Sequence, residues 1–289
     1  METRKIAANG LEFETDVAGV GGAKFALCLH GFPEEKYSWR YQIPLLVEEG
    51  YEVWVPNLRG YGGSSIPKGK DAYELKHLLA DVAALIDAGA QGRPVTLIAH
   101  DWGALIAWAF AIEKLRPLTR LIIMNVPHPA VFMEHVANKA QRKKSWYVFF
   151  FQIPWLPELA MTRRGAEAIG NAFVGSAVSK ERFPKEVLDV YRANALRPGG
   201  MTAMINYYRA NFGKDKGIVT YTRANSGGIT VPTLMVWGEQ DIALGVELSE
   251  GYEGLVADLT LQRLPDASHW VQQDQPDKVN AIMKAWLNR

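Results

Sequence analysis

Short apolar runs alternate with stretches of helical periodicity along most of the chain. Runs rich in Val, Ile and Leu predict buried strands over residues 24–29, 52–56, 94–99, 121–125, 233–237 and 259–264. Apolar residues at offsets of three and four predict helices over residues 73–89, 103–114 and 276–287. Because the strand segments are apolar throughout and alternate with helices, they indicate a parallel sheet that is covered on both faces.

This alternation is interrupted between residues 129 and 226. The segment is mostly helical in composition, is rich in aromatic residues, and is broken by several prolines before Gly227-Gly228. The strand and helix pattern then resumes. We therefore predict an α/β protein with a doubly wound, mostly parallel sheet. Its core comprises residues 1–128 and 227–289, and a helical domain of residues 129–226 is inserted between the two parts.

Composition and charge narrow the class of protein. The 289 residues are 48% hydrophobic and 22% charged, which allows a sizeable core and argues against wholesale disorder. With 32 basic and 31 acidic side chains, the net charge of +1 argues against a nucleic-acid partner. The single cysteine, Cys28, lies in an apolar run, which predicts a buried inert thiol and excludes both an internal disulfide and a Cys-rich zinc site.

The chain carries no recognisable targeting or membrane-spanning segment. The first ten residues lack a long apolar run, so a secretory signal peptide is not expected. No apolar stretch reaches the ~18 residues that a transmembrane helix needs. We expect a cytoplasmic protein without a membrane span, and its oligomeric state stays open.

The segment from Leu97 to Ala104 predicts a nucleophile elbow. A strand ends, one residue turns sharply, and a helix begins; the neighbouring Ala99, Gly103 and Ala104 are small enough for the strand and helix to touch. The residue at the tip is Asp101, whereas an esterase or lipase needs Ser. A carboxylate attacks carbon without a base to activate it, and the product is an ester of Asp101. The alternative is that Asp101 only caps the following helix.

Four motifs in order resemble those of the α/β-hydrolase superfamily, and specifically its epoxide hydrolases. They are His30-Gly31-Phe32-Pro33-Glu34, the loop Asn57 to Ser65, His100-Asp101-Trp102-Gly103, and Asn125-Val126-Pro127-His128-Pro129. The resemblance extends from about Val20 to the C-terminus. It implies an α/β-hydrolase fold in which the helical insertion is a cap, and it implies a cis peptide bond between Phe32 and Pro33.

The remaining members of a catalytic triad must follow the nucleophile, with the acid before the histidine. Asp241 follows the strand predicted at 233–237, and His269 follows the last strand. Taken alone, Asp241 could be a turn residue and His269 a packed histidine, but Asp101 favours a triad. His100 precedes the nucleophile and, by strand alternation, should point away from it. The other histidines are weaker candidates, namely His30, His77, His128 and His135.

An oxyanion that forms during ester hydrolysis needs N–H donors. In this fold the donors are expected to be the backbone amides of Phe32 and Trp102. The resemblance also implies two cap tyrosines, Tyr147 and Tyr208, that hydrogen-bond the epoxide oxygen. Phenols with an ordinary pKa of about 10 suit that task because they stay neutral until they are needed. The alternative is that both tyrosines are packing residues, and Tyr207 makes the register at Tyr208 ambiguous.

The sequence thus predicts an epoxide hydrolase. Asp101 attacks an oxirane carbon, His269 oriented by Asp241 activates water, and a vicinal diol leaves; no metal or organic cofactor is required. The substrate is expected to be a small apolar epoxide, and the candidate pocket-lining residues are Phe32, Trp102, Trp146 and Phe150.

Two alternatives remain open. A haloalkane dehalogenase shares the Asp nucleophile, but it needs halide donors, commonly an Asn where this chain has Phe32. A fluoroacetate dehalogenase carries an Arg where this chain has Trp102. The second alternative is a hormone- or ligand-binding α/β-hydrolase without turnover, against which the complete triad and the two tyrosines argue.

Overall fold

The central element of the computed structural model is a sheet of eight strands, within the described residues 1–136, 138–213 and 216–289. The strand order is β1-β2-β4-β3-β5-β6-β7-β8. The strands are β1 (Glu2–Ala8), β2 (Leu11–Ala18), β3 (Lys24–Leu29), β4 (Tyr51–Pro56), β5 (Val95–His100), β6 (Arg120–Met124), β7 (Thr233–Gly238) and β8 (Leu259–Leu264). From β4 to β8 all neighbours are parallel, whereas β1 and β2 form an antiparallel hairpin whose second strand pairs antiparallel with β4.

Helices cover both faces of this sheet. The α-helices are α1 (Gln42–Glu48), α2 (Leu75–Ala90), α3 (Trp102–Ile112), α4 (Pro129–Val136), α5 (Lys139–Lys144), α6 (Trp146–Phe150), α7 (Leu156–Ser176), α8 (Lys185–Leu196), α9 (Gly200–Asn211), α10 (Arg223–Ser226), α11 (Val271–Asp274) and α12 (Pro276–Leu287). Short 3-10 helices are η1 (Lys36–Trp39), η2 (Lys70–Tyr73), η3 (Lys180–Arg182), η4 (Gly217–Thr220) and η5 (Val246–Ser249). None of the helices in this described part of the chain combines the length and hydrophobicity that crossing a bilayer requires.

Two separate apolar layers explain why the inner strands lack alternation. One layer joins α1 and α12 to the sheet, with Cys28 and Ile98 among its buried residues. The other joins α2 and α3 to the opposite face, with Leu27 and Leu97 among its members. Successive residues of a strand point to opposite faces, so a strand covered on both sides must be apolar at every position. The predicted doubly wound sheet is confirmed, and Cys28 is buried as expected.

The amino-terminal hairpin was not evident from the sequence. The first four residues of β1 are charged or polar and exposed, so no apolar periodicity marks this strand. In β2, Phe13, Thr15 and Val17 are almost fully buried, but Asp16 and Ala18 are buried too and Thr15 is polar, so the apolar alternation is incomplete. Predicted and observed bounds of the inner strands differ by one residue at most, because their ends coincide with the ends of the apolar runs.

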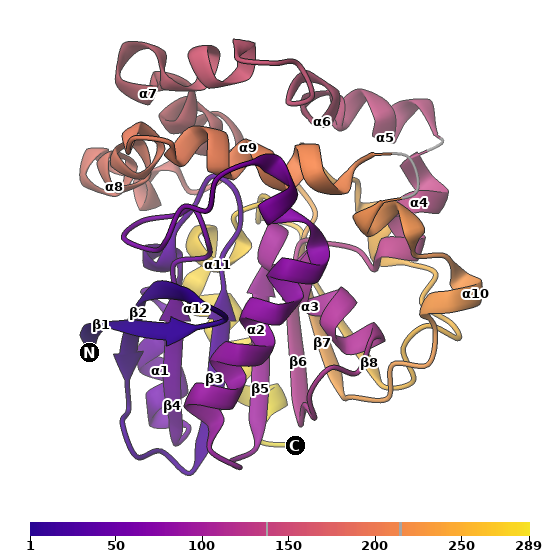
Figure 1. Ribbon diagram of the computed structural model, residues 1–289. Helices are drawn as coiled ribbons and strands as arrows, with labels where there is room; N and C mark the ends of the chain where they lie inside the picture. The colour runs from indigo at the N-terminus through magenta and orange to yellow at the C-terminus, as the bar shows by residue number, and fades with distance from the viewer. Residues whose placement is uncertain (137, 214–215) are drawn as a thin grey trace.

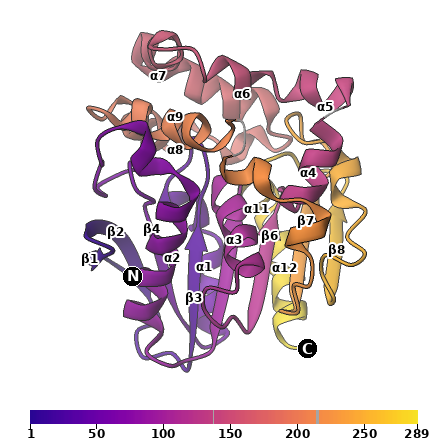
Figure 2. The same ribbon diagram turned by 45° about the vertical axis from the view of Figure 1, so that its right-hand side comes forward.

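The helices α4 to α10, here called the helical layer, connect β6 to β7. Figures 1 and 2 show α5 to α9 lying over the edge of the sheet at which β3 and β5 end. Hydrogen bonds fix this layer to the loops below it: Asn194 in α8 donates to the Glu34 carbonyl at 3.1 Å, and the Tyr207 hydroxyl in α9 donates to the Arg59 carbonyl at 2.9 Å. Parallel strands end at this edge, which is where ligand sites of such sheets form.

Candidate active site

Asp101 occupies a sharp turn between β5 and α3. Its backbone has φ 47° and ψ −121°, a conformation that residues other than Gly rarely adopt. Two glycines make this turn possible. A Cβ on Gly31 would lie 2.2 Å from the Asp101 Cβ, and a Cβ on Gly103 would lie 2.4 Å from the Leu29 carbonyl oxygen. The elbow therefore projects the carboxylate from the sheet edge, as the sequence predicts.

The two oxygens of the Asp101 carboxylate have different surroundings. The Phe32 N–H donates a hydrogen bond of 2.6 Å to Oδ1. Oδ2 lies 3.6 Å from His269 Nε2, which is longer than a hydrogen bond but shorter than the span of a bridging water. The peptide bond between Phe32 and Pro33 is cis, as the resemblance implies. The role expected of the Trp102 amide stays a prediction.

His269 is held from behind by Asp241. The Nδ1–H of His269 donates to Asp241 Oδ2 at 2.7 Å, so Nε2 faces Asp101. Asp241 in turn accepts hydrogen bonds from the Asn125 side chain at 2.9 Å and from the backbone amides of Ala243 and Leu244 at 2.7 and 2.9 Å. The carboxylate that orients the histidine is thus itself fixed at both oxygens.

The charges of this site are mutually stabilised. Burial lowers the pKa of His269, but the charges of Asp241 and Asp101 and the hydrogen bond to Asp241 outweigh burial and raise its pKa to about 10. Burial raises the pKa of Asp101, yet the nearby charge of His269 and the hydrogen bond from the Phe32 amide prevail, so the pKa of this carboxyl lies below its ordinary value. Asp101 is therefore ionised and His269 protonated at neutral pH.

A cavity of about 390 Å³ opens above the Asp101 carboxylate. Asp101 and His269 line its floor, and Tyr147 of α6 and Tyr208 of α9 line it from the helical layer. The two phenol rings are 6.0 Å apart between centroids and nearly perpendicular. Burial, followed by the charge of Asp101, raises the pKa of both phenols above the ordinary value, so both remain hydroxyl donors.

Three of the four predicted lining residues border this cavity, namely Phe32, Trp146 and Phe150. The Trp102 indole lies on the other side of the nucleophile. There it lines a narrow void of about 30 Å³, together with Phe132 and Phe212 and bounded by the same two tyrosines. The space around Asp101 is therefore asymmetric. We call the large cavity its wide arm and the narrow void its closed arm.

Sequence reasoning missed a buried polar network behind the elbow. His100 points away from the cavity, as predicted; its Nδ1 lies 2.8 Å from Glu34 Oε2 and its Nε2 lies 2.8 Å from the His269 carbonyl oxygen. The other Glu34 oxygen accepts from the Gln272 and Gln273 amides at 2.9 and 2.7 Å. Glu34 was quoted only as part of a motif, and the glutamines lie more than 230 positions further along the chain.

The remaining histidines have structural roles. His30 accepts from the Leu58 amide through Nε2 at 3.0 Å, and burial lowers its pKa to about 4. His128 accepts from the Ala130 amide through Nδ1 and contacts the Ser226 carbonyl through Nε2. Both shape loops, as expected. His77 and His135 lie in α2 and α4.

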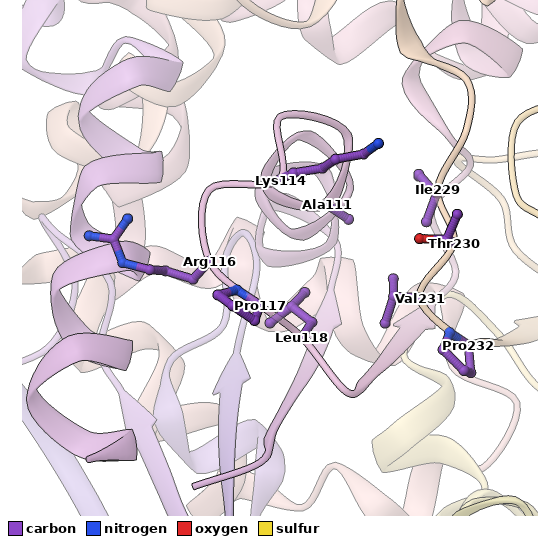
Figure 3. A pocket seen from close by; sticks show the side chains of 9 residues that line it. All are labelled: Ala111, Lys114, Arg116, Pro117, Leu118, Ile229, Thr230, Val231 and Pro232. Carbon is purple, nitrogen blue, oxygen red and sulfur yellow. The ribbon is translucent and has the colours of Figure 1, made fainter. Parts of the chain in front are cut away.

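A second hollow, of about 420 Å³, lies far from this chemistry. Figure 3 shows its lining, which comes from the end of α3 and from the loops that enter β6 and β7. Those loops are at the opposite edge of the parallel sheet from Asp101, and Lys114 and Arg116 supply its charged side chains. Asp101, His269 and both tyrosines line the other cavity.

Comparison with known proteins agrees with this architecture. Residues 27–276 match the family model described as the alpha/beta hydrolase fold. Epoxide hydrolase 4 of Homo sapiens is 37% identical over 98% of this chain and 77% of its own length. The AB hydrolase superfamily protein YfhM of Bacillus subtilis (strain 168) is 33% identical, over 98% of this chain and 96% of its own.

A solved structure is similar over the whole chain as well. The epoxide hydrolase of Bacillus megaterium, in complex with an inhibitor, superimposes with a TM-score of 0.89 at 30% identity, over 99% of this chain and 100% of its own. An eight-stranded, doubly wound sheet with an acid–histidine pair at its carboxyl edge defines an α/β-hydrolase. Within that class, the chain belongs to the epoxide hydrolase family.

Proposed function

We propose that this protein hydrolyses epoxides to vicinal diols through a covalent ester on Asp101. The observation that carries the proposal is the shared cavity of Asp101, Tyr147 and Tyr208. A nucleophilic carboxylate on one wall and two neutral phenols on the other suit a substrate whose leaving oxygen stays attached to the product. The core would be residues 1–128 and 227–289, and residues 129–226 would be the cap that supplies both phenols.

In the first step Asp101 Oδ2 attacks an oxirane carbon, and the bond between that carbon and the ring oxygen breaks. The ring oxygen takes the electron pair and becomes an alkoxide. Tyr147 and Tyr208 hydrogen-bond this oxygen, and one of them gives it a proton. Because Asp101 is ionised in the free enzyme, this step needs no base.

The second step follows from the loss of a charge. Alkylation neutralises Asp101 and removes the contribution of its charge to the raised pKa of His269, although Asp241 still raises it. The tyrosinate left by the first step takes the proton that His269 carries in the free enzyme. The neutral His269 then accepts a proton from water, and the hydroxide attacks the Asp101 ester carbon. The oxyanion forms at Oδ1, to which the Phe32 amide already donates; the Trp102 amide is the proposed second donor.

Collapse of this tetrahedral intermediate completes the cycle. The bond between the ester carbon and the diol oxygen breaks, and that oxygen takes the proton from His269. The carboxylic acid of Asp101 then gives its remaining proton to His269, which restores the ion pair of the free enzyme. One water is consumed, one diol is formed, and all side chains return to their starting states.

The two alternatives fit this site less well. A departing halide needs N–H donors, whereas the Phe32 side chain has none and the helical layer faces Asp101 with phenols. A ligand-binding protein does not require a histidine between two carboxylates. Here His269 lies 2.7 Å from Asp241 through Nδ1 and 3.6 Å from Asp101 through Nε2. The names of the similar proteins, epoxide hydrolases of several organisms, support the same choice.

The cavity also indicates the shape of the substrate. The wide arm of about 390 Å³ is bordered mainly by aromatic and aliphatic side chains, whereas the closed arm of about 30 Å³ has room for a group no larger than about one water. We therefore propose apolar epoxides with one bulky substituent as substrates. Epoxides with two bulky substituents in trans should react more slowly.

Product analysis tests the activity directly. Terminal, styrene-type and trans-disubstituted epoxides should yield diols, with the trans-disubstituted ones slowest, while haloalkanes should yield no halide.

A single turnover in oxygen-labelled water should first place the label in Asp101, because water attacks the ester carbon. Label found only in the diol after that turnover would mean direct attack of water on the substrate. Halide release, or binding without turnover, would contradict the proposed activity.

A further inference from the structure

Large apolar side chains are concentrated on the outer side of the helical layer. Six of them, on α6, at the start of α7 and on the turn between these helices, are well exposed although all lie within fourteen consecutive residues. We call them the outer patch: Trp146, Phe149, Ile153, Trp155, Leu156 and Leu159. Trp146, Phe149 and Trp155 are exposed by 61, 56 and 70%. Exposed aromatic and aliphatic groups gathered in this way mark an interaction surface.

The outer patch faces away from the rest of the molecule. Both ribbon views show α5, α6 and α7 along the outer side of the helical layer, on the opposite side of that layer from the sheet (Figures 1 and 2). On α6, Trp146 and Phe149 are three residues apart, a spacing that puts them on one side of the helix, and Ile153 lies in the turn that follows. The inner residues of the same helix, Tyr147 and Phe150, line the cavity.

Basic side chains accompany the outer patch. Residues 138–165 contain six Lys or Arg residues and one acidic residue, a net charge of +5 in a chain whose total is +1. Exposed among them are Lys139, Arg142, Lys143, Arg163 and Arg164, of which Arg164 pairs with Glu167 at 3.6 Å. The single acid, Glu158, is already held in a two-pronged ion pair by Arg209. The outer side of the layer therefore presents apolar groups between two basic clusters.

We propose that this outer surface docks on an anionic lipid bilayer. Trp and other aromatic side chains favour the interface between water and lipid, and Lys and Arg beside them are attracted by anionic headgroups. A second copy of this chain fits less well. A two-fold contact would bring the same net charge of +5 against itself, with Arg142 and Lys143 facing a surface of equal sign.

The mouth of the catalytic cavity belongs to this same surface. Lys144 and Trp146 line the cavity, and so does Ile242, which is also exposed. Docking would turn this mouth toward the lipid, from which an apolar substrate could enter directly. That consequence rests on the proposed function, whereas docking itself requires no turnover and is tested without substrate.

Vesicle binding tests the proposal. The full-length protein should co-sediment with vesicles of equimolar phosphatidylglycerol and phosphatidylcholine, bind much less to phosphatidylcholine alone, and dissociate as salt screens the charges. Removing two basic charges with Arg142→Gln and Lys143→Gln should lower partitioning on the order of tenfold. The double change Phe149→Ser and Trp155→Ser should lower it at least as much, since it removes two exposed aromatic groups.

Matched changes at the opposite edge of the sheet provide the controls. Lys114→Gln with Arg116→Gln removes two basic charges in the hollow of Figure 3, and Val20→Ser removes an exposed apolar side chain before β3. Both controls should bind vesicles like the wild type, and circular dichroism should show every variant folded.

The proposal is overturned if the wild type stays in solution, if it binds neutral vesicles equally well, or if the outer-patch variants bind unchanged. A dimer that dissociates on the Phe149 and Trp155 changes, without vesicle binding, would assign the surface to a second copy instead.

Discussion

Two adjacent tyrosines of α9 have different surroundings: one lines the cavity and the other packs against a loop. Tyr208 borders the cavity with Asp101, while Tyr207 turns its hydroxyl to the Arg59 carbonyl at 2.9 Å. A helix rotates by about 100° per residue, so adjacent side chains cannot both face the nucleophile. The resemblance implied a tyrosine at this point of the chain. Because Tyr207 and Tyr208 are adjacent, and the helix was expected only from composition, the sequence could not decide which of the two faces the cavity. The packing of α9 against the loop after β4 decides it.

Replacing either cavity phenol should slow ring opening. Tyr147→Phe and Tyr208→Phe each remove one hydrogen bond to the departing oxygen, and the pre-steady-state rate of ester formation should fall about tenfold to a hundredfold, with a larger loss for the double variant. Tyr207→Phe is the matched control and should leave this rate nearly unchanged. Unaltered ester formation in both single variants and in the double variant would remove the tyrosines from the mechanism.

Other site residues could not be found from the sequence because they act at a distance along the chain. Asn125 holds Asp241, and Glu34 joins His100 to α11, the helix after His269, each across more than 60 positions. Their residue types suit many structural roles, and only the convergence of strand ends brings them together. The positions of Asp101, Asp241 and His269 were predictable because each follows a strand in the order that the fold requires.

At the scale of elements, the contact between β5, α3 and the loop after β3 sets the position of Asp101. The Gly103 amide donates to the His30 carbonyl at 3.0 Å, so the first turn of α3 lies against the loop that supplies the Phe32 amide. The sequence predicted this contact from the small residues around Asp101. It gave no sign of the break inside α7, where Arg163 to Ala166 leave the helical conformation.

Filling this contact should damage both stability and catalysis. Gly103→Ala places a methyl 2.4 Å from the Leu29 carbonyl oxygen, so strand and helix must separate. Overpacking of this kind should lower the free energy of unfolding by about 1–3 kcal/mol, measured by urea denaturation, and should slow ester formation. Gly175→Ala in α7 is the matched control, because nothing lies within 4 Å of its added methyl. If Gly103→Ala were as stable and active as that control, the close approach would not constrain the elbow.

For the molecule as a whole, His269 links the active site to stability. Its pKa is about 10 in the folded protein and 6.5 ordinarily, so the folded state keeps a proton that the unfolded state has lost between these values. This contribution is complete below pH 6.5 and is lost as the pH rises toward 10. The free energy of unfolding should therefore fall above pH 6.5, by at most about 1.4 kcal/mol per pH unit.

Denaturation at several pH values checks this dependence. The useful window is pH 6.5 to 9.0, since the buried Cys28, whose pKa is raised, adds a trend of the same sign above its ordinary 9.0. His269→Gln should abolish most of the slope in this window. A wild-type stability that is constant or rises from pH 6.5 to 9.0 would mean that the folded protein does not hold the extra proton.

The covalent ester is the central claim, and His269→Gln tests it most directly. Asp101 needs no base, so the variant should still open the epoxide, but it should fail to activate water and should stall after one turnover. Intact-mass spectrometry should then show a gain equal to the whole epoxide, located on Asp101 by peptide mapping and absent when Asp101→Asn is added. A variant that stays unmodified under these conditions, or that gains only an alkyl group from a haloalkane, would contradict the account.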